Sequence, residues 1–186
     1  MREQILDTAF KHFARFGYSK TTISGIAEEL GKQKSALYYY FKNKEDIFCS
    51  IVAVEAENFL TELSVILNGK GNEALLLNNY INHRIRVIYG VAARYSLLKS
   101  ELFLLLPLIE LSRQPFHQKE VDQLAELLNK GVQSGTFRSF DCELNAKVIV
   151  NSLKGLEIPM FVKQEFNVDS KEIEAISSLV LNGIKN

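Results

Sequence analysis

The N-terminal quarter of the sequence places hydroxyl and cationic side chains where they can hold a polyanion. Thr22 and Ser24 stand at the start of a helical pattern, where unpaired backbone N–H groups and the positive end of the helix dipole favour a phosphate. Lys44 opens a later helical pattern and can direct its ammonium group toward the same phosphate backbone. Contacts of this kind fix the position of a protein on duplex DNA without distinguishing one base sequence from another.

A second group of side chains suits the base edges of the major groove. Lys34, Ser35 and Ala36 form the first turn of a short helical pattern. A lysine there can donate to guanine O6 or N7, and an alanine can pack on a thymine methyl group. Gln33 comes directly before them and is a poor helix cap, so it is a further candidate for a DNA contact. We expect these residues to select the bound sequence.

The elements that position these residues follow from the spacing of apolar side chains. Residues 5–16 show the spacing of a first helix, which Gly17 ends. A second helix begins after the expected N-cap Thr22 and ends at Gly31, and a third spans residues 34–41. Two short helices joined by a tight turn containing glycine are typical of the helix-turn-helix, whose second helix enters the major groove.

The remaining chain is also helical in pattern. A long helix is expected from about residue 44 to 67, and further helices are expected at 73–98, 101–112, 117–134, 143–164 and 170–184. The expected breaks lie near Pro107, Pro115, Ser134–Gly135 and Asn167. The sequence therefore predicts an all-α fold, in which a three-helix DNA-binding head (residues 1–48) is joined by a long helix to a C-terminal helical bundle, the body (residues 49–186).

The segment from Thr22 to Ile47, TISGIAEELGKQKSALYYYFKNKEDI, resembles the DNA-binding segment of the TetR family of bacterial transcription regulators. The similarity consists of Thr at the start of the second helix, an Ile-Ala pair four residues on, the turn glycine, Leu-Tyr-x-x-Phe in the third helix and the following Lys-Asn-Lys-Glu. The family often has Ser where this chain has Gln33. The resemblance implies phosphate contacts from Tyr38 and Tyr40, and a base-edge or thymine-methyl contact from Tyr39.

The resemblance also implies a function and partners. A chain of this kind is expected to be a homodimeric, sequence-specific DNA-binding regulator, in the usual mode a repressor released from a palindromic operator by a small-molecule effector. Palindromy is expected because one short recognition helix reads too few base pairs to be selective. The alternative is a protein of the same fold that binds partners but no longer binds DNA. The presence of Thr22, Tyr38 and Lys44 argues against that alternative.

The sequence favours neither an enzyme nor a metal-binding or membrane protein. The net charge is +0, but the first fifty residues carry eight Lys or Arg and six Asp or Glu, which suits a local DNA-binding surface. Cys49 and Cys142 form no disulfide framework, and the three histidines make no close-spaced metal pair. Glycine and serine spacings fit neither a nucleophile elbow nor a phosphate loop. No apolar run is long enough for a bilayer, so we expect a cytoplasmic protein. The lack of metal-site and phosphate-loop patterns leads us to expect no cofactor.

Polar residues near the apolar segment 102–109 are candidates for an effector pocket, because ligand sites combine apolar walls with a few polar groups. The candidates are Tyr80, His83, Arg84, Arg86, Tyr89 and Phe103. His83 shares a helix face with Arg86, and Tyr80 shares one with Arg84, so at most one of these pairs points inward. An inward arginine would suit a carboxylate on a small, largely apolar effector. Alternatively, both arginines are solvated and the segment 102–109 is ordinary core.

The last two expected helices, 143–164 and 170–184, are candidates for the dimer interface. Their apolar positions exceed what one flank of a small bundle needs, and a glycine allows close helix approach. The residues expected at this interface are Leu153, Gly155, Leu156, Ile176 and Val180. Alternatively, these faces complete the core of the monomer.

Overall fold

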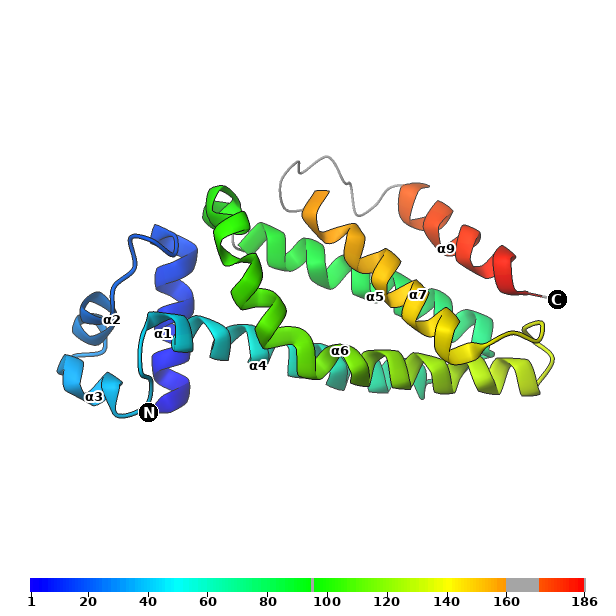
Figure 1. The fold of residues 1–186 in the computed structure, drawn as a ribbon, viewed down its shortest axis with the longest axis horizontal. Helices are drawn as coiled ribbons and strands as arrows, with labels where there is room; N and C mark the ends of the chain where they lie inside the picture. Colours follow the sequence, from blue (N-terminus) through cyan, green and yellow to red (C-terminus); the bar gives the residue numbers. More distant parts are fainter. Residues whose placement is uncertain (95, 160–170, 186) are drawn as a thin grey trace. The chain divides into compact units, whose positions relative to one another are not determined.

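The computed structural model describes residues 1–94, 96–159 and 171–185, and these residues are arranged in helices (Figure 1). In chain order the elements are α1 (Arg2–Phe16), α2 (Ile23–Glu29), α3 (Lys34–Tyr38), α4 (Lys44–Leu67), α5 (Glu73–Arg94), the 3-10 helix η1 (Ser96–Glu101), α6 (Leu102–Gln133), α7 (Cys142–Gly155) and α9 (Lys171–Ile184). The predicted all-α fold is confirmed. None of the described helices is both long and apolar enough to cross a bilayer.

The chain groups into two compact units. One comprises Met1–Glu57 and Ala93–Pro115, and the other comprises Asn58–Ala92 and Phe116–Asn186. From the sequence we expected a division after residue 48. The first unit also includes η1 and the start of α6, because η1 packs on α1 and Glu101 accepts hydrogen bonds from the backbone that follows α1.

The core of the first unit forms along one face of α1. Ile5, Ala9 and Phe13 recur at four-residue intervals and are fully buried, as the helical spacing predicts. The Phe13 ring meets the Phe48 ring edge to face, with 5.6 Å between centroids, and stacks on the Tyr18 ring at 5.5 Å. α1, the segment after it and the start of α4 therefore share one apolar core.

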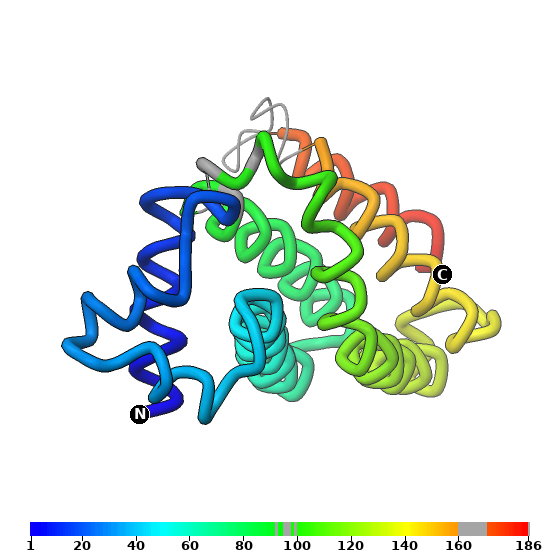
Figure 2. Tube along the Cα trace, turned by 60° about the vertical axis from the view of Figure 1, so that its left-hand side comes forward, coloured from blue at the N-terminus to red at the C-terminus, as the bar shows by residue number. Residues whose placement is uncertain are grey.

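The core of the second unit is a continuous apolar cluster supplied by the end of α4, by α5, by the second half of α6 and by α7 and α9. α7 and α9 lie side by side in both views (Figures 1 and 2). Phe137 follows α6 and is 1% exposed. Its backbone N–H donates to the Gly131 carbonyl at 2.9 Å, so the chain folds back over the end of α6 and places the ring against Gly131.

Several expected helix boundaries are wrong, including the end of the third helix, which lies at Tyr38 instead of residue 41. α6 continues from Leu102 to Gln133 through Pro107 and Pro115, where the sequence predicts two helices. Both prolines are exposed, so water can reach the carbonyl groups that lose an N–H partner, which lowers the cost of a proline inside a helix. In addition, α5 ends at Arg94 and residues 96–101 form η1, where the sequence predicts a helix that continues to residue 98.

The prediction for the C-terminal helices is tested in part. α7 ends at Gly155 and α9 begins at Lys171. Residues 160–164 of the expected helix 143–164, and the break expected near Asn167, lie outside the described residues.

We predict that Gly131→Ala destabilises the second unit. A β-carbon at this position would overlap the buried Phe137 ring, and overpacking a core costs about 1–3 kcal/mol. Gly90→Ala is the matched control, because Gly90 is also helical and a β-carbon there meets nothing within 4 Å. The control is expected to be stabilising by about 0.5–1 kcal/mol through helix propensity. Urea denaturation measures both variants, and equal stabilities would contradict the close packing at Gly131.

Candidate nucleic-acid interface

The linker between α1 and α2, residues 17–22, has a defined conformation. Gly17 has a φ of 81°, which an L side chain rarely adopts. The Thr21 hydroxyl donates to the Gly17 carbonyl at 2.7 Å. The Thr22 hydroxyl oxygen accepts from the Gly25 N–H at 3.0 Å, which confirms Thr22 as the N-cap of α2. These bonds fix the direction in which α2 leaves α1.

A tight turn joins α2 to α3. Gly31 has a φ of 61°, and the Lys32 N–H donates back to the Ala27 carbonyl at 2.9 Å. α3 then begins at Lys34, and the side chain of the preceding Gln33 makes no capping hydrogen bond. The arrangement α2–turn–α3 is a helix-turn-helix, with α3 as the recognition helix.

α3 buries one side and exposes the other. Leu37 is fully buried and Phe41 is 2% exposed, and these side chains anchor α3 on the core. The sequence-predicted contact residues of this segment are exposed, except the half-buried Ala36: Gln33, Lys34, Ser35, Ala36, Tyr38, Tyr39 and Tyr40. Thr22 and Ser24 at the start of α2 are exposed as well. The structure thus presents on the head surface all the predicted groups except Lys44.

Aromatic rings and a cation are combined on this surface. Tyr39 is 83% exposed, and its ring meets the Tyr40 ring edge to face at 5.0 Å. The Lys34 ammonium lies 5.4 Å from the centroid of the Tyr38 ring, within the range of a cation–π contact. Ammonium and phenol groups held next to one another make a set of donors suited to phosphate and base-edge acceptors.

Lys44 has a different environment from the one expected. Its ammonium donates to the Tyr18 carbonyl at 2.8 Å and to the Ser19 carbonyl at 3.5 Å, and it lies 4.2 Å from the centroid of the Tyr18 ring. The side chain therefore holds the linker between α1 and α2 from the start of α4. Lys44 is half-buried in this position and ties the start of α4 to the linker.

The predicted effector residues are only partly brought together. Of the two possible pairs, Tyr80 and Arg84 point inward, with Tyr80 fully buried and Arg84 2% exposed. Arg86, Tyr89 and Phe103 are exposed, and Phe103 belongs to the first unit. His83 is half-buried; its ring stacks on the Phe59 ring at 6.0 Å, and its Nε2 lies 3.0 Å from Glu62 Oε2 in a geometry that makes no hydrogen bond.

The inward arginine is already occupied by carboxylates of this chain. Arg84 Nε donates to Glu120 Oε1 at 2.7 Å and an Arg84 NH group donates to Glu157 Oε1 at 3.1 Å. The Tyr80 hydroxyl donates to the same Glu120 oxygen at 2.8 Å. Burial disfavours the charged form of Arg84, but the nearby carboxylates, Glu120 foremost, hold its pKa above the ordinary value. Burial, followed by the charge of Glu120, raises the pKa of Tyr80.

The residues predicted at a dimer interface on α7 and α9 differ in burial. Leu153 is 3% exposed and belongs to the apolar core of this chain. Leu156, Ile176 and Val180 are partly buried against the same core, whereas Gly155 is exposed. The strongly exposed apolar residues of these helices are instead Leu144, Val148 and Leu179, at 57%, 52% and 79%.

The structure draws attention to two residues that the sequence analysis did not name, Glu101 beside the head and Leu179 on α9. Glu101 accepts hydrogen bonds from the head, but its partners are more than eighty positions away in sequence, so no local pattern marks it. Leu179 lies off the apolar face of α9 that the helical spacing indicates, and an apolar residue on the polar face is a signal that could have identified it.

An exposed recognition helix that carries lysine, serine and tyrosine, mounted on a helix-turn-helix and followed by a helical bundle, defines a DNA-binding protein with a separate body. Residues 5–51 match the sequence model of a family described as "Bacterial regulatory proteins, tetR family". The DNA-binding segment of this chain is therefore that of the TetR family of bacterial transcription regulators.

Full-length relatives have the same architecture. The "Fatty acid metabolism regulator protein" of Bacillus subtilis is 24% identical over 98% of this chain and 95% of its own length. A "transcriptional regulator of the TetR/AcrR family" from Thermobifida fusca is 25% identical, with a TM-score of 0.74 over 100% of this chain and 98% of that one. The "transcriptional regulator FadR from Bacillus subtilis in complex with stearoyl-CoA" is 22% identical, with a TM-score of 0.76 over 99% of this chain and 100% of that one.

The structure distinguishes the roles of the two lysines of the head. Lys34→Ala is expected to change which DNA sequence is preferred, because Lys34 lies on the exposed first turn of α3. Lys44→Met is expected to weaken binding to the preferred sequence more than to other sequences and to leave the salt dependence unchanged, because its ammonium contacts the carbonyl groups of the linker that positions α2. Titration of labelled duplexes at several salt concentrations measures both effects. A salt slope reduced by about one in Lys44→Met would instead indicate a lost phosphate contact.

Arg84→Ala is expected to act on stability. Removing one partner of a buried charge pair typically costs about 3–5 kcal/mol, and this change leaves the carboxylates of Glu120 and Glu157 without their guanidinium. The exposed Arg86→Ala is the matched control and should melt within about 2 °C of the parent. Calorimetry compares the two variants, and a parent-like melting temperature for Arg84→Ala would contradict the buried cluster.

Proposed function

We propose that this chain acts in the cytoplasm as a homodimeric repressor that binds a palindromic operator through two copies of α3 and is released by a small-molecule effector. The observation that carries the proposal is the exposed face of α3, where Lys34, Ser35 and Tyr39 face solvent above the buried Leu37. A surface with these donors suits the major groove of duplex DNA, even though the net charge of the chain is +0.

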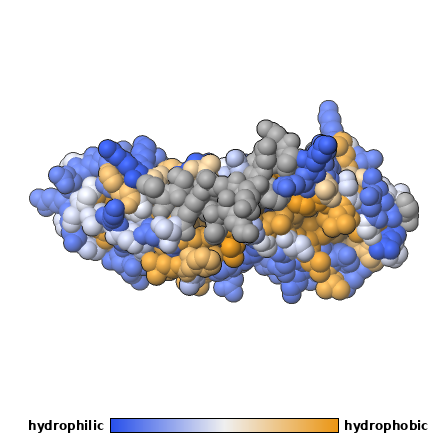
Figure 3. Space-filling model, turned by 90° about the horizontal axis from the view of Figure 1, so that it is seen from above, coloured by the Kyte–Doolittle hydropathy of each residue, from blue (hydrophilic) through white to orange (hydrophobic). Residues whose placement is uncertain are grey.

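Dimerisation through α7 and α9 follows from their exposed apolar side chains. Leu144 and Val148 lie one turn apart on α7, and Leu179 lies on α9. In Figure 3 hydrophobic residues gather on the part of the body where Figure 1 places α7 and α9. A second copy covering this surface would remove it from water, which is favourable in proportion to the apolar area buried.

The dimer proposal predicts that the combined change Leu144→Glu and Leu179→Glu yields a folded monomer. Both side chains are exposed, so the charges cost little in the isolated chain but oppose association. Operator affinity should fall by about 10²–10⁴-fold, since the second head no longer binds as part of the same molecule. Val65→Glu is the matched control, because Val65 is 72% exposed on α4 and should leave the dimer intact. Sedimentation that shows a dimer in the double variant would refute this placement.

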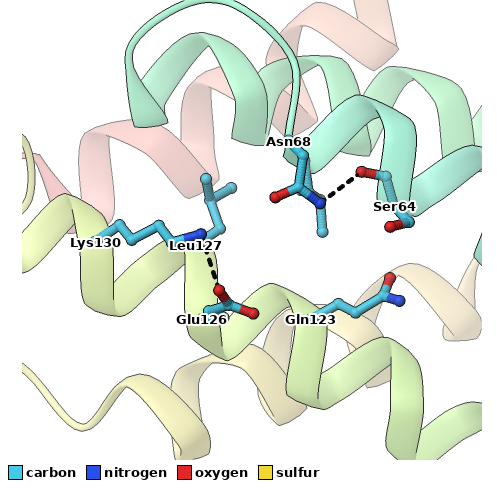
Figure 4. A pocket seen from close by; sticks show the side chains of 7 residues that line it. Ser64, Asn68, Gln123, Glu126, Leu127 and Lys130 are labelled. Carbon is cyan, nitrogen blue, oxygen red and sulfur yellow. Dashed lines mark hydrogen bonds and ion pairs between the residues drawn. The ribbon is translucent and has the colours of Figure 1, made fainter.

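The relatives suggest the chemical class of the effector. One is named for fatty acid metabolism, and another has stearoyl-CoA in its structure. We therefore propose an effector with a long acyl chain, which matches the apolar interior of the second unit. A hollow between the end of α4 and α6 is lined mainly by polar side chains, among them Ser64, Asn68, Gln123 and the ion pair Lys130–Glu126 (Figure 4). Its polarity does not suit an acyl chain.

The proposal is tested by isolating the genomic fragments that the protein binds and titrating stearoyl-CoA against the complex. Release with a tenfold loss of operator affinity requires about 1.4 kcal/mol of coupling between the two ligands. Coenzyme A without the acyl chain is the control and should release little DNA. No enrichment of any fragment would refute the DNA-binding function, whereas enrichment without release by stearoyl-CoA would refute only the effector class.

A further inference from the structure

Glu101, the last residue of η1, lies against the linker that sets the direction of α2. Its Oε2 accepts from the Tyr18 N–H at 2.7 Å and its Oε1 accepts from the Ser19 N–H at 2.9 Å. The Lys44 ammonium donates to the carbonyl groups of the same two residues, at 2.8 Å to Tyr18 and 3.5 Å to Ser19. A carboxylate therefore holds the amide groups of this short segment while an ammonium holds its carbonyl groups.

Gly17 leaves room for the Glu101 carboxylate beside the linker. A β-carbon on Gly17 would come within 3.1 Å of Glu101 Oε2, and the φ of Gly17 is 81°, so a larger residue is disfavoured at this position for two separate reasons. Burial disfavours the charged carboxylate, but hydrogen bonds from Ser19 and Tyr18 and the charge of Lys44 hold the pKa of Glu101 below its ordinary value. The group is therefore ionised at neutral pH, and its hydrogen bonds are of the strong, charge-assisted kind.

We propose that Glu101 is a positioning residue, which holds the direction in which α2 leaves α1 and thereby the orientation of the recognition helix α3. The Tyr18–Ser19 segment leads directly into Thr21, which bonds back to Gly17, and into the N-cap of α2 at Thr22. Without the carboxylate of Glu101 the two amide groups lose their acceptor, and the direction of α2 is no longer held from this side.

This inference rests on the proposed function, since it assumes operator binding by α3. It makes a distinct claim, because Glu101 touches no residue of the proposed DNA surface. Loss of Glu101 should therefore reduce selective binding, which needs both recognition helices in register, more than non-selective binding, which needs only exposed cations near phosphates.

The test compares Glu101→Ala, Glu101→Gln and the control Glu110→Gln, which changes an exposed carboxylate further along α6. Affinities for an enriched genomic fragment and for a scrambled duplex are measured at several salt concentrations, at a temperature where circular dichroism shows each variant fully folded. Glu101→Ala should bind the fragment at least tenfold more weakly, within the range typical of coupling between sites. Its affinity for the scrambled duplex should stay within twofold of the parent, and its salt slope should be unchanged.

Glu101→Gln should be intermediate, because glutamine keeps one acceptor oxygen but loses the charge that faces Lys44. Glu110→Gln should match the parent. The inference is overturned if Glu101→Ala binds the enriched fragment as the parent does, or if both duplexes weaken by the same factor, which is what general disorder of the head would produce. Failure of the parent protein to enrich any fragment refutes the proposed function instead.

Discussion

A helix as short as α3 has too few internal hydrogen bonds to persist in water by itself. It exists here because Leu37 and Phe41 are inserted into the core of the first unit, so the recognition surface is stable only as the outer side of a buried contact. The same contact decides what remains outside. Since Leu37 faces inward, Ser35 on the far side of the helix faces outward, and Lys34 and Tyr38 at the flanks of the buried face remain exposed.

The position of α3 in turn depends on how α2 leaves α1, and here opposite charges fix the backbone. Lys44 and Glu101 come from different elements and hold the carbonyl and amide groups of the same two residues. Peptide groups in a linker lack the partners that a helix supplies, and partly buried ones must find them elsewhere. These partners are charged side chains from the start of α4 and the end of η1, so the geometry of the linker depends on both elements.

In the body, buried charged side chains are paired with one another and not with backbone groups. Arg84 lies among apolar side chains and is matched by Glu120 and Glu157, because an unpaired guanidinium in such a place would be very costly. The cluster joins α5, α6 and the segment after α7. An effector that contains a carboxylate would have to displace one of these glutamates from Arg84, whereas an acyl chain needs only apolar contacts. The cluster is thus better described as a tie between elements than as an anchor for a ligand.

What the sequence alone determined about this protein is local. The spacing of Ile5, Ala9 and Phe13 specified the buried face of α1, Thr22 and the turn glycine specified α2 and its end, and the outward groups of α3 followed from helical geometry. Periodicity and capping act within one or two turns of a helix, so a single sequence contains them.

Only the tertiary structure decided which charges meet and which apolar faces stay open. Glu101 and Tyr18 are far apart in the chain, as are Arg84 and Glu157, and nothing near either residue indicates its partner. The packing of whole helices likewise decides that Lys44 donates to the Tyr18 carbonyl, that Leu153 is buried and that Leu144 is exposed. The continuity of α6 through Pro107 and Pro115 likewise depended on which side of the helix faces water, because that decides whether a carbonyl without its N–H partner is solvated or stranded.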